Sequence, residues 1–225
     1  MIDTRHLDDL PDVPTLRQLC QSLAMLDAIL SPEWTYRNYC FNARWSDGRM
    51  MASMRNGSGD EYYILFNRSG AIIKGYAHEA PLAAYQVGHG VPYPGVIDHV
   101  PSEFADFLAE PAFESQVATF CLWRRTGDHA WHRGPLALPR GDDPDGSAYL
   151  LRMLDGDPRT YRAWAEEYFE LEAPEERVVP LAGVERVYRH EPLSDALVTL
   201  LNPSVQLADL ADDVREIGYP QGECI

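Results

Sequence analysis

Apolar residues follow two different periods along the chain, and the two periods predict helices and strands. Between residues 15 and 30, leucines recur at steps of three and four, which places them on one face of an amphipathic helix. Thr15 with Gln18 three residues later fits a capping box at the start of this helix, and Pro32 is expected to end it. The polar residues 1–13 are expected to form a loose leader.

Residues 34–78 are predicted to form an antiparallel meander. Tyr39, Phe41, Ala43 and Trp45 alternate with polar positions, a period of two that is typical of a half-buried strand. Asp47-Gly48 supplies the residues that a tight hairpin requires. Further strands are predicted at 50–55, 61–67 and 71–77, joined by turns at 56–60 and 68–70.

The rest of the chain divides into an irregular stretch, a second hairpin and a helical tail. Residues 80–100, rich in Pro and Gly, are expected to be irregular, and a short helix follows Pro101. Residues 119–125 and 130–133 are expected to extend the sheet as a hairpin, and a polar break follows at 140–146. The tail predicts helices at 149–154, 193–201 and 207–217, with another opened by Asp157 as N-cap and Pro158.

These elements predict an α+β fold: an antiparallel sheet of four to six strands packed by helices, with an α-helical C-terminal region. Helices this short seldom fold alone. We therefore expect residues 1–225 to form a single domain, in which a helical part (147–220) packs on a β-rich part (14–140). A separate helical subdomain is the alternative.

The charge of the chain is strongly acidic and uneven. The net charge is −16, and residues 142–225 carry −12 of it, with 19 acidic and 7 basic residues. Such a field repels nucleic acid and anionic membranes and attracts basic partners. We therefore expect no nucleic-acid partner and no membrane partner, although solubility alone would also explain the charge.

The four cysteines are scattered and form no CxxC pair, which favours reduced thiols over a disulfide framework. The N-terminus has neither a basic n-region nor an apolar h-region, and the longest apolar runs are too short to cross a bilayer. A cytoplasmic location is the expectation that follows.

Aromatic residues supply one candidate surface. Trp123 and Trp131 fall in one predicted hairpin, close to several Arg and His residues. They could form a stacking surface for a partner. The alternative is that they pack in the core, as tryptophans in paired strands commonly do.

Histidines and carboxylates supply a second candidate. His78-Glu79 ends the fourth predicted strand, and His99 flanks the 80–100 stretch. Asp60 and Glu61 could join His78 as acid–base groups at one end of the sheet. The spacing contains neither HExxH nor HxH, so no metal site is predicted.

Other signature motifs are missing. The run at 142–146 does not match a calcium loop, because Gly141 and Arg152 stand where ligands are required. The glycines at 57 and 59 lack the Lys and the helix of a phosphate loop, and no GxSxG or GxGxxG is present. No cofactor is expected, and the sequence does not decide whether the protein is an enzyme.

Four segments resemble a family of uncharacterised bacterial proteins: NGSGDEY at 56–62, IKGYAHE at 73–79, FCLWRR at 120–125 and EIGYP at 216–220. The resemblance implies a bacterial cytoplasmic protein and no particular activity. The segment VPSEFADFL at 100–108 also resembles a helix of the SUKH superfamily of bacterial immunity proteins.

Three functional hypotheses follow. The first is an acidic immunity- or antitoxin-type module that captures a basic protein through Trp123, Trp131, Glu166, Glu167 and Glu170. The second is an enzyme or small-ligand-binding protein whose pocket, near the 80–100 stretch, contains Asp60, Glu61, His78, Glu79 and His99. The third is a structural subunit of an assembly, and the oligomeric state is not predicted.

Overall fold

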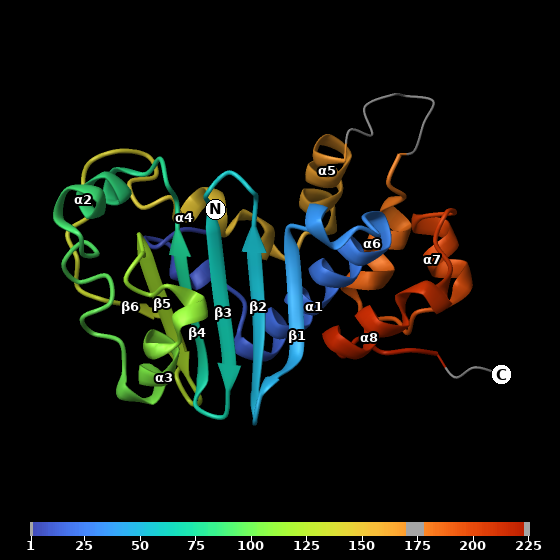
Figure 1. Cartoon of the computed structure of the whole chain (residues 1–225), viewed down its shortest axis with the longest axis horizontal. Coiled ribbons are helices and arrows are strands. Elements are labelled where there is room, and N and C mark those ends of the chain that lie inside the picture. Colours follow the sequence, from blue (N-terminus) through green and yellow to red (C-terminus); the bar gives the residue numbers. More distant parts are fainter. Residues whose placement is uncertain (1, 170–177, 223–225) are drawn as a thin grey trace.

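The computed structural model describes residues 2–169 and 178–222 and contains a six-stranded antiparallel sheet packed by helices (Figure 1). The predicted α+β fold is confirmed. The strands lie in the sheet in the order in which they occur along the chain. They are β1 (Tyr39–Ser46), β2 (Arg49–Arg55), β3 (Glu61–Asn67), β4 (Gly70–Tyr76), β5 (Phe120–Arg125) and β6 (His132–Arg133).

Short turns between neighbouring strands explain this meander. Asp47-Gly48 joins β1 to β2 with Ser46 paired to Arg49, and Gly48 has a φ of 65°, as the sequence predicted. Another two-residue turn joins β3 to β4. The connection from β4 to β5, by contrast, runs through more than forty residues and carries helices α2 (Pro81–His89) and α3 (Ala105–Ala109).

Helix α1 (Val13–Leu30) packs against the sheet and against the C-terminal helices. Leu16, Leu19, Leu23 and Leu26 of the predicted stripe are buried, and Leu30 is partly buried. From residue 19 to residue 29 the helix is buried on all sides, so the polar face expected of an amphipathic helix is not exposed there. The helix starts earlier than expected, because the Asp12 carboxylate accepts a 2.9 Å hydrogen bond from the Thr15 backbone N–H. Thr15 is therefore inside the helix, and the predicted capping box at Thr15 and Gln18 is wrong.

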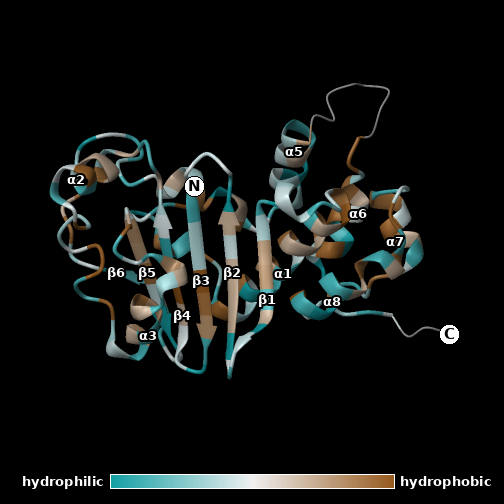
Figure 2. Cartoon of the chain, in the orientation of Figure 1, coloured by the Kyte–Doolittle hydropathy of each residue, from teal (hydrophilic) through white to brown (hydrophobic). Residues whose placement is uncertain are grey.

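Helices α5 to α8 gather beside the β1 edge of the sheet, whereas α4 lies near the upper ends of β3 and β4 (Figure 1). Their bounds are α4 (Ser147–Leu150), α5 (Pro158–Tyr168), α6 (Leu181–Tyr188), α7 (Asp195–Leu201) and α8 (Ala211–Ile217). In Figure 2, α5 and α8 show mainly hydrophilic colours, whereas the central strands are more hydrophobic. Asp157 caps α5 through the Arg159 N–H, and Pro158 opens it, as predicted.

Two hydrophobic clusters cover the two faces of the sheet. The larger one reaches from Ile2 to Tyr219 and combines α1, one sheet face and the C-terminal helices. The smaller one lies on the other face, where Ile72 packs with Phe107 and other residues of the β4–β5 connection. One continuous core thus joins the β-rich and the helical parts of the chain.

Other local expectations also differ from the structure. The leader, expected to be loose, is anchored: Ile2 and Thr4 are buried, and the Thr4 hydroxyl donates a hydrogen bond to Asp145. Residues 81–89, expected to be irregular, form α2, because a proline in the first turn has the φ that a helix needs. The helix expected at 149–154 is divided into α4 and a 3-10 turn at Arg152–Asp155.

Within residues 2–169 and 178–222, no helix has both the length and the apolar character needed to cross a bilayer.

Candidate functional site

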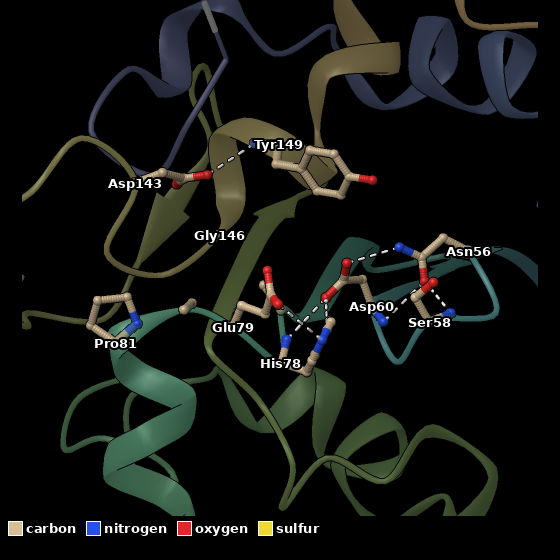
Figure 3. A pocket seen from close by; sticks show the side chains of 11 residues that line it. Asn56, Ser58, Asp60, His78, Glu79, Pro81, Asp143, Gly146 and Tyr149 are labelled. Atoms are coloured by element: carbon tan, nitrogen blue, oxygen red, sulfur yellow. Dashed lines mark hydrogen bonds and ion pairs between the residues drawn. The ribbon is translucent and has the colours of Figure 1, made fainter. Parts of the chain in front are cut away.

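A pocket of about 560 Å³ lies where β3 begins and β4 ends, at the upper end of these strands in Figure 1. Figure 3 shows its side chains from close by. Three segments form it: the β2–β3 turn, the junction between β4 and α2, and the loop that leads into α4. Its lining residues are Asn56, Ser58, Asp60, Ala77, His78, Glu79, Ala80, Pro81, Asp143, Gly146 and Tyr149.

One wall of the pocket carries a paired imidazole and carboxylate. His78 Nδ1 lies 2.7 Å from Asp60 Oδ1, and the His78 backbone N–H donates a 2.9 Å hydrogen bond to the same oxygen. Asp60 thus fixes both the main chain and the ring of His78 (Figure 3). With Nδ1 facing a carboxylate, Nε2 is the ring nitrogen available to a bound molecule. Glu79 Oε1 lies 3.8 Å from it.

The β2–β3 turn holds Asp60 in place through Asn56. The Asn56 side-chain amide donates a 2.8 Å hydrogen bond to Asp60 Oδ2, while its carbonyl oxygen accepts from the backbone N–H groups of Ser58 and Asp60. Asn side chains favour such local bonds in turns. Both Asp60 oxygens therefore have a fixed partner.

Electrostatics favour the charged form of this pair. Burial raises the pKa of the Asp60 carboxyl, but the hydrogen bonds from His78 and Asn56 outweigh it, and the net pKa lies below its usual value of 3.8. The hydrogen bond to Asp60 is the main reason that the pKa of His78 lies above its usual 6.5. The imidazole therefore keeps its proton to a higher pH than a free histidine does.

The opposite wall of the pocket comes from a distant part of the sequence. Asp143 accepts 3.0 Å hydrogen bonds from the backbone N–H groups of Ala148 and Tyr149 at the start of α4. The Tyr149 ring is exposed, with the Arg152 guanidinium 4.0 Å from its centroid. Figure 3 shows Asp143 and Tyr149 across the pocket from His78.

A buried hydrogen-bond cluster fixes this wall from behind. The hydroxyls of Thr4 and Ser147 donate to the two oxygens of Asp145, at 2.5 and 2.6 Å. Burial is the main influence on this carboxyl and raises its pKa. The N-terminal segment therefore determines where the 143–149 loop lies.

Two residues predicted for the pocket lie elsewhere. Glu61 does not line the pocket; its carboxylate pairs with Lys74 Nζ at 3.0 Å and accepts a 3.1 Å bond from the Tyr63 hydroxyl. Glu61 and Tyr63 share one face of β3 because side chains alternate along a strand. His99 is exposed and is not among the lining residues. Asp60, His78 and Glu79 are the predicted residues that meet.

Trp123 and Trp131 are core residues, as the second interpretation of the hairpin holds. Trp123 is 6% exposed and Trp131 is 4% exposed, and they belong to the clusters on opposite faces of the sheet. Trp123 pairs with His132 across β5 and β6, so these two side chains share one face of the sheet. Trp131 precedes His132 in the sequence and therefore points to the opposite face. The Trp131 ring N–H donates a 2.7 Å bond to the Pro11 carbonyl. They do not form a surface for a partner.

The predicted acidic contact residues on α5 have different environments. Glu166 accepts a 2.9 Å bond from Arg162 and a 3.2 Å bond from the Val179 N–H, whereas Glu167 is exposed. Glu170 lies outside the described residues. Within 2–169 and 178–222, no group of three or more His, Cys, Asp or Glu side chains is placed to hold a metal ion.

Sequence reasoning missed the residues that complete the pocket. Asn56 was assigned to a turn and Asp143 to a polar break, and both roles are correct. Their proximity to His78 depends on tertiary contacts, which leave no local signal. A hydrogen-bonding Asn within a Gly-rich turn next to Asp60 was the signal that could have been followed.

No protein-family model, curated protein sequence or solved structure matches this chain.

Proposed function

We propose that the protein binds a small polar molecule in the pocket around His78, and that His78 donates a proton to it or accepts one from it. The observation that carries the proposal is the 2.7 Å contact between His78 Nδ1 and Asp60 at the wall of a pocket of about 560 Å³. Pockets of this size are typical of small-molecule sites.

The arrangement suits acid–base chemistry. A carboxylate on Nδ1 selects the tautomer whose Nε2 can accept a proton, and it stabilises the imidazolium that results. The same pairing lets His78 donate from Nε2 when it is protonated. Asp60 is a positioning residue in this scheme, and Asn56 orients Asp60 in turn.

Rigidity around the pair supports a binding role. A simple turn does not require an aspartate that is fixed by hydrogen bonds at both oxygens and on the backbone. Here those bonds hold an imidazole in one orientation next to a cavity. Preorganisation of this kind lowers the entropy lost when a ligand binds.

A ligand screen by two-dimensional NMR tests the proposal. The library consists of small molecules that carry amine, carboxylate, phosphate or hydroxyl groups. Binding compounds are expected to shift the amide signals of Ser58, His78 and Tyr149 together. His78→Ala should raise the dissociation constants of those compounds by about tenfold or more, since a hydrogen bond to a charged group contributes about 1.5–3 kcal/mol.

His99→Ala is the matched control, because His99 is exposed and lies outside the pocket. It should leave binding unchanged. A library in which no compound shifts the three amide signals, or compounds that bind His78→Ala as well as the wild type, would rule the proposal out.

The cytoplasmic location belongs to the proposal as well. Cys20 and Cys121 are buried free thiols, as is common for proteins of a reducing compartment.

A further inference from the structure

Three exposed aromatic side chains lie on two adjoining elements, and none of them lines the pocket. Trp34 and Tyr36 belong to the 3-10 turn Trp34–Tyr36 between α1 and β1, and Tyr168 is the last residue of α5. Their exposed fractions are 60%, 58% and 37%. The Tyr168 hydroxyl donates a 3.2 Å hydrogen bond to the Tyr36 carbonyl, which joins the two elements. We call these three residues the aromatic patch.

The turn that carries the patch is held rigidly from inside. Arg37 donates to the carbonyls of Ser31 and Pro32, at 2.9 and 3.0 Å, and its guanidinium also pairs with Asp213 of α8. The Arg37 side chain is only 8% exposed. One buried guanidinium thus fixes both the start of the turn and its position on α8.

The residues that follow the turn are anchored as well. The Asp27 carboxylate accepts backbone hydrogen bonds of 2.8 and 2.9 Å from Asn38 and Tyr39. Tyr168 stacks on Trp164 with ring centroids 5.0 Å apart, and Arg55 lies 5.6 Å over the Trp34 ring. The backbone beneath the patch is therefore preorganised, and the rings of Trp34 and Tyr168 each have an internal contact.

This combination is characteristic of an interaction surface. Water-exposed Trp and Tyr rings are unfavourable by the hydrophobic effect, so a partner that covers them gains this free energy. Trp and Tyr are the residue types that dominate binding energy at protein interfaces. A rigid surface also loses little conformational entropy on binding.

Charge decides which kind of partner fits. A second copy of the chain would bring another net charge of −16, and like charges disfavour association. Glu33 and Glu167, both exposed, lie next to the patch in sequence, and the exposed Arg55 over the Trp34 ring is the cation at the patch. We propose that the aromatic patch is a docking surface for a basic polypeptide segment, which covers the rings and places its Lys or Arg side chains near these acidic residues.

The test uses the full-length protein and short synthetic peptides. One set combines Arg and Lys with Leu and aromatic residues, and a second set replaces every Arg and Lys by Glu. The ring N–H signal of Trp34 in NMR spectra is the readout. The basic set is expected to shift this signal in a saturable way, with weaker binding at high salt, and the acidic set is expected to leave it unchanged.

Two sets of variants separate the contributions of aromatic contact and charge. The double variant Trp34→Ser, Tyr36→Ser should raise the dissociation constants of the basic peptides by about tenfold or more, as measured by calorimetry. Because both side chains are exposed, folding should be unaffected, which circular dichroism verifies. Glu33→Lys with Glu167→Lys should slow association. Val87→Ser on α2 is the control, since Val87 is 82% exposed and lies at the other end of the sheet (Figure 1).

Three results would overturn the proposal. One is a basic set that leaves the Trp34 signal unchanged. Another is peptides that bind the double variant as tightly as the wild type, which would reduce the effect to charge alone. The third is a dimer in sedimentation experiments that the double variant abolishes, since a second copy would then occupy the patch. Binding of small molecules near His78 is independent of each.

Discussion

The Tyr161 hydroxyl donates a 2.7 Å hydrogen bond to the Asp27 carboxylate, and this buried contact ties helix α5 to helix α1. The second Asp27 oxygen accepts the N–H groups of Asn38 and Tyr39 at the start of β1. One carboxyl group therefore joins the long helix, the sheet and the C-terminal helices. Burial raises its pKa from 3.8 to about 7, against the lowering effect of these hydrogen bonds.

The raised pKa of Asp27 predicts a pH-dependent stability. The folded state keeps the Asp27 proton up to about pH 7, whereas the unfolded chain releases it near pH 4. Protonated Asp27 therefore adds its full contribution to the free energy of unfolding below pH 4, and this contribution is lost as the pH rises from 4 to 7. The decline is up to about 4 kcal/mol, at about 1.4 kcal/mol per pKa unit.

Asp27→Asn isolates this contribution. The amide resembles the protonated carboxyl and can still accept from the two backbone N–H groups. Urea unfolding of both proteins between pH 4 and 8 should show the variant gaining on the wild type as the pH rises. A difference in unfolding free energy that is constant across this range would show that Asp27 does not titrate there.

The strands could be predicted because both of their signals are local. Alternation of apolar and polar residues defines β1, and the Asp47-Gly48 dipeptide defines its turn. Helix α6 was missed, although Leu181, Val184 and Val187 have the three-residue spacing of a helical face. The leader was misjudged because its burial depends on Asp145, which lies 141 residues from Thr4.

The candidate site was predicted only in part, for the same reason. Asp60 and His78 come together because β3 and β4 are paired neighbours, and such pairing follows from the predicted meander. Asp143 reaches the pocket through a loop whose path no local pattern determines. Glu61 was misassigned because a one-residue step along a strand reverses the side-chain direction, which sends it to Lys74.

The ion pair of Glu61 with Lys74 predicts a large effect of a conservative change. The Lys74 side chain is fully buried, and burial lowers its pKa while Glu61 opposes that effect. Glu61→Gln leaves a buried ammonium without the carboxylate that pairs with it and should destabilise the fold by about 3 kcal/mol, the low end for a buried pair, because Glu61 is 23% exposed. The measurement is urea unfolding at pH 7.

Two further variants check the cause. Adding Lys74→Met to Glu61→Gln removes the orphaned charge and should restore part of the lost stability. Glu79→Gln is the surface control, because Glu79 is 89% exposed, and it should change stability by less than about 0.5 kcal/mol. If the double variant proves less stable than Glu61→Gln alone, the ion pair is not the source of the effect.

Asp60 predicts how His78 titrates. The pKa of His78 is raised in the folded state. The contribution of the His78–Asp60 contact to the free energy of unfolding is therefore fully present below pH 6.5 and is lost as the pH rises through the folded pKa of His78. Asp60→Asn removes the carboxylate and should lower the pKa of His78. The ring C–H signals in NMR spectra report this, with the His99 signal as internal control. An unchanged His78 titration would show that Asp60 does not control its protonation.

Gly146 predicts that the pocket wall tolerates no side chain at this position. Its φ is 74°, and a Cβ atom there would lie 2.0 Å from the Cβ of Ala77. Gly146→Ala should lose about 1 kcal/mol through backbone strain and a further 1–3 kcal/mol, roughly, through the collision. It should also displace the 143–149 loop from His78 and shift the amide signal of His78.

Gly156 provides the matched control, because its φ is 75° and nothing lies within 4 Å of a Cβ atom there. Gly156→Ala therefore introduces the backbone strain without the collision. In urea unfolding it should lose less unfolding free energy than Gly146→Ala does. Ala77→Gly, added to Gly146→Ala, removes the colliding methyl group and should recover the difference. Equal losses for Gly146→Ala and Gly156→Ala would mean that Ala77 does not define the wall of the pocket.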